Sequence, residues 1–219
     1  MRRDLQFMGR MTAGMTHEIN NVLAVIRESA GLAQDLATLG EAAEFAHRDR
    51  IVACLGQVQT QIDRGGRLTR ALNRFAHSVD HDRGAASMEE LIGLTVALND
   101  RHARQHRVTL EYEPGSDAAT VETDLFLFVE ALSRLIVRAV ASLEGEGKVL
   151  LSCNPEDTGM PRAVRVTPQG ALTPAASADE DPTADLAEEM ASCGLSVVLR
   201  ADNEAPPAWL FCAQDPVLP

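Results

Sequence analysis

The sequence predicts an α+β protein of two domains, a helical hairpin over residues 1–83 and an α/β sandwich over residues 84–219. Apolar and small residues recur at alternating spacings of three and four along 5–36 and again along 51–79, the period of a helical bundle. After residue 83, short alternating segments are mixed with helical ones, which is typical of an α+β domain. Charge divides the chain in the same place: the first part carries eleven Arg against ten Asp and Glu, a net charge of +1, and the second carries −13.

The first helix of the hairpin is predicted from Leu5 to about Leu36, with Gly40 as a stop signal, and the second from Ile51 to about Val79. The seam of the first helix contains Leu5, Met8, Thr12, Met15, Ile19, Val22, Ile26, Ser29, Ala33 and Leu36. The predicted seam of the second helix contains Ile51, Leu55, Val58, Ile62, Gly65, Thr69, Leu72, Ala76 and Val79. Residues 80–84 interrupt the pattern and are predicted as a linker. A single hairpin would leave part of these stripes exposed, so we expect two copies to form a dimeric four-helix bundle.

Composition excludes several classes of function. No apolar run approaches the roughly 20 residues that cross a bilayer, and the N-terminus has no apolar signal core. The four cysteines are far apart and form no Cys-x-x-Cys pair, which favours reduced thiols in a cytoplasmic protein. No stripe of basic residues is present, so nucleic acid is not an expected partner. The sequence therefore predicts a cytoplasmic protein that binds neither membrane nor nucleic acid.

His17 is the first candidate for chemistry, because the helical register places it opposite the seam. Its neighbours three and four residues away are all short: Ala13, Gly14, Asn20 and Asn21. A helical glycine costs about 1 kcal/mol relative to alanine, a cost that close approach of another molecule would explain. Glu18 can orient the imidazole or accept its proton, and Asn21 can position a water or a phosphoryl oxygen. A solvated surface histidine is the ordinary alternative, and no second ligand at helical spacing supports a metal site.

The segment MGRMTAGMTHEINNVLAVI (8–26) resembles the phosphoacceptor segment of sensor histidine kinases, in which His-Glu-x-x-Asn lies on the first helix of a dimeric hairpin. The resemblance implies that His17 is the phosphorylated residue, Glu18 its acid-base neighbour and Asn21 the residue that assists dephosphorylation of the partner. Family members often carry proline directly after that asparagine. Here the residue is Val22, so we expect a helix with less of a kink.

The second domain follows the element order of the ATP-binding domain of the same kinases. Ser87-Met88-Glu89-Glu90 reads as a capping box that opens a helix to about Gln105. The further expected elements are a strand at 107–113, a helix at 124–143, strands at 147–154 and 162–167, a helix at about 184–193 and strands near 195–201 and 208–213.

The three nucleotide-binding elements of those kinases are not recognisable here. Arg138 occupies the position at which the resemblance places the asparagine that binds Mg²⁺, and a guanidinium offers no lone pair to a cation. Residues 164–174 stand where an aspartate would bind adenine, and they contain none. Cys193-Gly194-Leu195 replaces the glycine-rich phosphate loop, whose backbone amides would approach phosphates. We therefore expect no ATP, no metal and no other cofactor to be bound.

Together these features predict a histidine phosphotransferase of a two-component phosphorelay without autokinase activity. Only 16 residues precede His17 in this sequence, too few for a sensor region within it. His17 would take a phosphoryl group from the aspartate of one response-regulator receiver domain and pass it to another, and the receiver would supply Mg²⁺. Two alternatives remain open at this point. One is a response-regulator phosphatase that uses Asn21, and the other is a non-catalytic module that binds a kinase or a receiver.

Overall fold

A computed structural model describes residues 2–38, 44–77, 83–115, 120–153, 162–173, 183–200 and 208–213. The chain divides into two compact units, Met1–Asn73 and Arg74–Pro219. The α+β class predicted from the sequence is confirmed, with helices in the N-terminal unit and a mixed sheet with helices in the C-terminal one. None of the helices in the described part of the chain combines the length and apolarity needed to cross a membrane.

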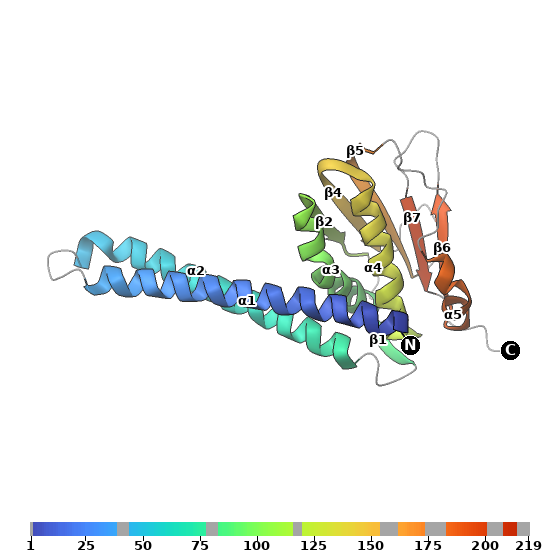
Figure 1. Cartoon of the computed structure of the whole chain (residues 1–219), viewed down its shortest axis with the longest axis horizontal. Coiled ribbons are helices and arrows are strands. Elements are labelled where there is room, and N and C mark those ends of the chain that lie inside the picture. Colours follow the sequence, from blue (N-terminus) through green and yellow to red (C-terminus); the bar gives the residue numbers. More distant parts are fainter. Residues whose placement is uncertain are drawn as a thin grey trace. The chain divides into compact units, whose positions relative to one another are not determined.

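The N-terminal unit is a hairpin of two long helices, α1 (Arg2–Thr38) and α2 (Glu44–His77). They lie side by side and run in opposite directions (Figure 1). The buried positions of α1 include five of the predicted seam residues: Met15, Val22, Ser29, Ala33 and Leu36. α1 passes Val22 as one continuous helix, as expected where the family's proline is missing.

The buried face of α2 differs from the predicted one. Its buried residues include Cys54, Leu68 and Ala71, whereas Leu55 and Ile62 are 54% and 50% exposed. The sequence placed these two residues in the seam. α2 carries apolar residues on two neighbouring faces, and only one of them packs against α1 within the chain. Gly65 lies on the packed side, where an added Cβ would be 3.1 Å from Cγ1 of Val22, so the missing side chain lets the helices approach closely.

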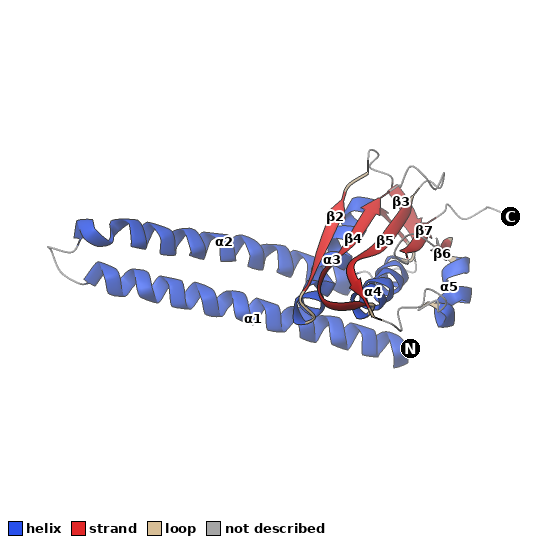
Figure 2. Ribbon diagram, turned by 90° about the horizontal axis from the view of Figure 1, so that it is seen from above, coloured by secondary structure: helices blue, strands red, loops and turns tan. Residues whose placement is uncertain are grey.

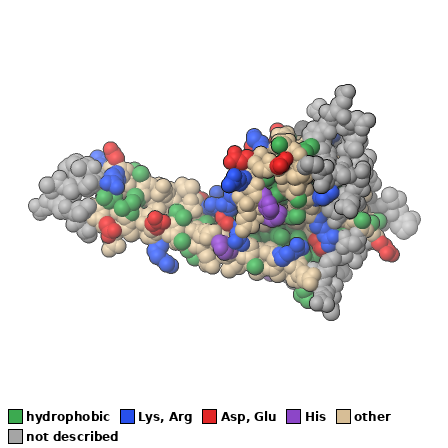
Figure 3. Space-filling view, turned by 45° about the horizontal axis from the view of Figure 1, so that its top comes forward, with side chains coloured by type: hydrophobic (Ala, Val, Ile, Leu, Met, Phe, Trp, Pro, Cys, Tyr) green, Lys and Arg blue, Asp and Glu red, His purple; other side chains and the backbone are tan. Residues whose placement is uncertain are grey.

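The residues left half-buried or exposed form what we call the outer stripe: Ile19, Leu23 and Ile26 on α1, and Ile51, Leu55, Val58 and Ile62 on α2. The spacing is four and three on both helices. Viewed from its N-terminus, each helix has these residues beside its buried face, turned from it in the same direction around the helix axis. Because the two helices are antiparallel, both sets of residues lie on the same side of the hairpin. Hydrophobic side chains are visible on the surface of the helical unit in Figure 3.

The C-terminal unit contains a five-stranded sheet in the order β2-β4-β5-β7-β6. Its strands are β2 (Val108–Glu113), β4 (Leu143–Cys153), β5 (Ala163–Leu172), β6 (Leu195–Arg200) and β7 (Ala208–Ala213). β2 and β4 are parallel, and the other neighbours are antiparallel. Figure 2 shows the strands side by side, with helices packed against the sheet.

Two helices, α3 (Met88–Gln105) and α4 (Leu125–Ala141), pack against each other and against the sheet. Ser87 caps α3 by accepting a hydrogen bond from the backbone N–H of Glu90 at 3.2 Å, which confirms the N-cap predicted from the sequence. Most residues of α4 are buried, and its Phe128 ring meets Phe211 of β7 edge to face, with centroids 4.8 Å apart. A short 3-10 turn (Ala184–Leu186) and helix α5 (Ala187–Ser192) precede β6.

Two short strands were absent from the prediction. β1 (Gly84–Ser87) and β3 (Thr120–Thr123) pair antiparallel, so Gly84 belongs to a strand and not to the predicted linker, whose residues 80–82 lie outside the described part, as does Gly40. β5 also extends to Leu172, further than expected, through Pro168. The pairing of β5 with β7 ends at Val166. At Pro168, β5 therefore has a neighbouring strand on one side only, a position at which a proline without an N–H is tolerated.

Candidate functional site

The candidate site lies on α1, where His17 is exposed. Asn21 lies one helical turn further along, and its side-chain nitrogen is 3.2 Å from Nδ1 of His17. Residues four apart on a helix share a face, so the helix itself brings these two side chains together. The contact is made at Nδ1, so Nε2 is the ring nitrogen that takes no part in it.

The proton on the imidazole decides what Nε2 can do. A neutral ring carries one proton, and the nitrogen without it holds the lone pair. Nε2 is therefore nucleophilic only when the proton is on Nδ1, which then donates to an acceptor. The Asn21 amide has both a donor and an acceptor, and a half-turn of the amide group presents its oxygen to Nδ1–H. Asn21 can thus serve either tautomer.

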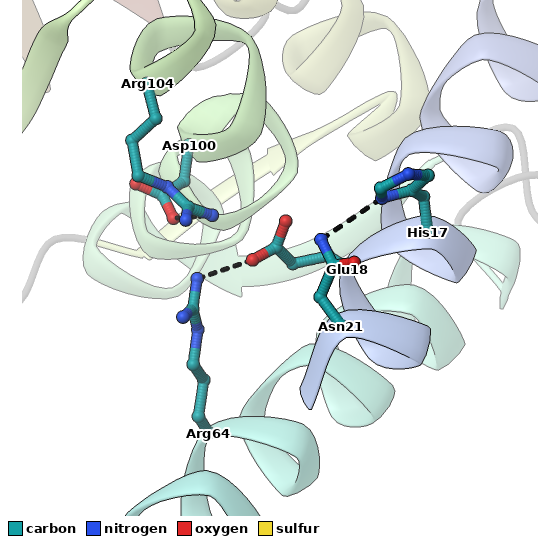
Figure 4. Close-up of polar contacts among 6 residues, drawn as sticks. All are labelled: His17, Glu18, Asn21, Arg64, Asp100 and Arg104. Atoms are coloured by element: carbon teal, nitrogen blue, oxygen red, sulfur yellow. Dashed lines mark hydrogen bonds and ion pairs between the residues drawn. The ribbon is translucent and has the colours of Figure 1, made fainter. Parts of the chain in front are cut away.

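Glu18 lies on a different side of α1 from His17. Glu18 is buried, with a side chain that is 6% exposed, and its Oε1 accepts a hydrogen bond from Nη2 of Arg64 on α2 at 2.6 Å. Figure 4 shows His17 and Glu18 leaving the helix in different directions, with Glu18 pointing toward Arg64. The bond recorded at Nδ1 of His17 is the one to Asn21, whereas the sequence also offered Glu18 for that place. The acid-base role of Glu18 stays a prediction.

Arg64 is the residue of this site that sequence reasoning missed. A signal was present in the sequence, because Gln57, Arg64 and Ala71 recur every seven residues on α2. Gln57 and Ser29 also meet across the hairpin, where the Ser29 hydroxyl donates to Oε1 of Gln57 at 3.3 Å. Gln57 and Arg64 are polar residues seven apart on the same face of α2, and such a pair indicates partners on the facing helix.

The surface beside His17 is open. A Cβ added to Gly14 would meet no atom within 4 Å, and the same holds for Gly31 further along α1. Side chains next to the imidazole are therefore short, and the ring projects from a rigid helix toward space that another molecule can occupy. This geometry suits a group that must enter the active site of a partner protein.

In the C-terminal unit, residues at or near the positions that the resemblance compares with nucleotide motifs make local contacts. Arg134 lies one turn before Arg138 on α4, and its Nη2 bonds Oε1 of the buried Glu130 at 2.8 Å. Gly194 follows the end of α5 with a φ of +75°, and its N–H donates to the carbonyl of Ala191 at 3.2 Å. That amide closes a helix C-terminus. In the described ranges, no three His, Cys, Asp or Glu side chains gather as metal ligands would.

No protein-family model matches this sequence, and no curated protein matches it. Solved structures of similar shape include the cytoplasmic segment of the histidine kinase QseC (15% identity, TM-score 0.49, covering 70% of this chain and 95% of that one). The match to a bacterial phosphotransferase has 15% identity and a TM-score of 0.47, and it covers 94% of this chain and 96% of that one. The match to the histidine kinase ThkA, solved in complex with the response regulator TrrA, has 16% identity and a TM-score of 0.48. It covers 96% of this chain and 62% of that one.

Two of these three structures are named as histidine kinases, the family that the segment around His17 resembles. With TM-scores below 0.5 and identities of 15–16%, the likeness assigns no activity to this chain.

Proposed function

We propose that the protein is a histidine phosphotransferase of a two-component phosphorelay, with His17 as the phosphoryl carrier. The observation that supports this most is the arrangement at His17: an exposed imidazole on a helix, with Nδ1 next to the Asn21 amide and Nε2 outside that contact. Only small side chains surround it. A surface histidine with no function would need neither an orienting partner nor a cleared approach.

In the proposed step, the Nε2 lone pair of His17 attacks the phosphorus of an aspartyl phosphate on a response-regulator receiver domain. The N–P bond forms as the P–O bond to the aspartate breaks, and the aspartate leaves as a carboxylate. Nδ1 keeps its proton and donates a hydrogen bond to Oδ1 of Asn21, whose amide has turned by a half-turn from the orientation in the structure. This hydrogen bond stabilises the positive charge that grows on the ring. The receiver supplies Mg²⁺ for the phosphoryl oxygens, and this chain supplies an oriented nucleophile. Transfer to a second receiver is the reverse step.

The C-terminal unit supports transfer in preference to ATP-dependent autophosphorylation. Arg138 brings a positive charge to the position that the resemblance gives to a magnesium ligand, and Arg134 is already bonded to Glu130. The backbone amide of Gly194 is used by α5. In the described part of this unit, a cation and an occupied amide both disfavour binding of ATP·Mg²⁺, which supports a phosphoryl group that comes from another protein.

The outer stripe supports the homodimer. An isolated hairpin that exposes half of Leu55, Ile62 and Leu23 gains stability when a second copy covers them. Two hairpins joined through this stripe form a four-helix bundle by a twofold operation. His17 lies on the other side of α1 from Ile19 and Ile26 by helical periodicity, so the dimer leaves it accessible.

The test uses a panel of receiver domains that carry labelled aspartyl phosphate, mixed with the full chain and with His17→Gln. Appearance of acid-labile label on the wild-type chain alone supports the transferase. Transfer of label to the His17→Gln variant would rule it out. Binding of receivers without movement of phosphate would instead favour the non-catalytic binding module.

A phosphatase is the second candidate, because the amide of Asn21 is exposed next to the ring and can orient a water on the receiver's aspartyl phosphate. In that case label leaves the receiver as free phosphate, Asn21→Ala abolishes the release, and His17→Gln retains part of it. Phosphate release that is unchanged in Asn21→Ala would exclude this candidate.

A further inference from the structure

The contact between Glu18 and Arg64 shows which residue of α2 shares a side of the hairpin with His17. Nη2 of Arg64 lies 2.6 Å from Oε1 of Glu18. Asn21 follows Glu18 by three residues, and Arg67 follows Arg64 by three. Three residues turn a side chain by about 60° around the helix axis, in the same direction on both helices. Because α1 and α2 are antiparallel, Asn21 and Arg67 lie on the same side of the hairpin, where Asn21 contacts His17.

The height of Arg67 along the hairpin follows from a second contact between the helices. A Cβ added to Gly65 would lie 3.1 Å from Cγ1 of Val22, so these two residues are opposite each other. Arg67 is two residues beyond Gly65 and is therefore opposite Asn20, two residues before Val22. His17 lies three residues from Asn20, about 4.5 Å along the axis. Arg67 and His17 are both exposed and lie within one helical turn of each other in height.

Positive charge gathers at the end of the hairpin that contains His17. Residues 5–17 and 64–73 contain four arginines and no aspartate or glutamate. Residues 18–38 and 44–63 contain three arginines and six acidic residues, a net charge of −3. In a chain with a net charge of −12, the His17 end of the hairpin is therefore a region of positive potential, which favours an anion.

A phosphoryl group on His17 is such an anion. The receiver's Mg²⁺ neutralises the phosphoryl oxygens only while the receiver is docked, so a carrier that moves between two receivers benefits from a cation of its own. An arginine offers N–H donors in a planar fork that matches two phosphoryl oxygens.

We propose that Arg67 binds the phosphoryl group at His17, donating hydrogen bonds to its oxygens as the N–P bond forms and after the receiver has left. The inference rests on the proposed function in that His17 is the phosphoryl acceptor. Arg67 is then a second residue of the site, supplied by the facing helix, whereas Asn21 contacts the imidazole itself.

The test phosphorylates the full chain with phosphoramidate, a small donor that needs no receiver. The lone pair of an imidazole nitrogen attacks the phosphorus, and the P–N bond of the donor breaks. The nitrogen of the donor is already protonated at neutral pH, so it leaves as ammonia. The rate at His17 is read from the tryptic peptide 11–27, and the other five histidines of the chain serve as internal references.

Arg67→Gln should lower the rate of labelling at His17 about three- to tenfold and leave the other histidines unchanged. Arg67→Lys should restore part of the rate, because it returns the charge without the fork. Raised ionic strength should slow the wild type and have little effect on Arg67→Gln. Helix content measured by circular dichroism should be the same in all variants, since Gln and Lys are good helix formers.

Arg70→Gln is the matched control. Arg70 is also an exposed arginine of α2, and its Nη1 would lie 3.3 Å from a Cβ added to Gly66, on the side of α2 away from α1. This variant should label as the wild type does. A wild-type rate in Arg67→Gln, or an equal fall in Arg70→Gln, would overturn the proposal, because the second result would reflect net charge and not a contact at His17.

A parallel assay with phosphorylated receivers separates this proposal from the proposed function. If no receiver labels the wild type but the phosphoramidate rate depends on Arg67 as described, the phosphotransferase is wrong and the role of Arg67 stands. If receivers label His17 in the wild type, and both donors label Arg67→Gln equally fast, only the role of Arg67 fails.

Discussion

Substitution of the outer stripe gives a quantitative test of the proposed dimer. Leu55 and Ile62 are 54% and 50% exposed in the single chain. Full burial of such a side chain contributes about 1.5–3 kcal/mol, so the half that remains exposed contributes about 1 kcal/mol. A twofold interface contains each residue twice, and the two positions together contribute about 4 kcal/mol to association. Leu55→Glu with Ile62→Glu should therefore raise the dimer Kd at least about a thousandfold.

Analytical ultracentrifugation over a range of concentrations measures this change. The wild-type chain should sediment as a dimer at micromolar concentrations, and the double variant as a monomer of unchanged helix content. Val137→Glu is the control, because Val137 is an exposed apolar residue of α4 in the C-terminal unit, and its dimer should dissociate as the wild type does. A wild-type monomer at tens of micromolar, or a double variant that dimerises normally, would refute the assignment of the outer stripe.

Three further predictions concern the C-terminal unit. Tyr112 is the sole tyrosine, and burial, followed by the nearby Cys153 and Glu89, raises its pKa to about 12; its ultraviolet titration should have a midpoint near 12 in the folded chain and near 10 in urea. Because the folded state holds this proton more tightly, Tyr112 should make the unit less stable as pH rises through 10, and Tyr112→Phe should reduce that loss in urea melts. Ser87→Ala removes the cap of α3 and should cost about 1 kcal/mol of unfolding free energy; no loss in a urea melt would contradict the cap. Phe128→Ala should cost about 3–5 kcal/mol in the same melt, and a loss below 1 kcal/mol would show that the core around Phe211 is loosely packed.

Much of the fold followed from local patterns in the sequence. The three-and-four spacing marked both long helices, and the capping box at Ser87 located the start of α3. The strands β1 and β3 were not predicted from the sequence, because each has four residues, too few for an alternating pattern to stand out. Their pairing is a contact between distant segments, which local propensity does not encode.

The candidate site was predicted in part. His17 and Asn21 follow from their spacing of four, because that spacing places two side chains on one helical face. The direction of the Glu18 side chain could not be predicted from the sequence, because it depends on which face of α1 packs against α2. α2 has apolar residues on two faces, so the sequence alone did not decide that Leu55 would turn outward and Arg64 inward. The partner of a buried charge is known only when the facing helix is placed.

The central claim is that a phosphoryl group resides on His17, and peptide mapping tests it most directly. Trypsin cleavage after Arg10 and Arg27 releases residues 11–27, in which His17 is the one histidine. After mixing with a phosphorylated receiver panel and removal of the receivers, mass spectrometry under alkaline conditions should find one acid-labile phosphate on this peptide. The same label on another peptide, or on residues 11–27 of His17→Gln, would contradict the account. So would a wild-type chain that remains unlabelled across the panel.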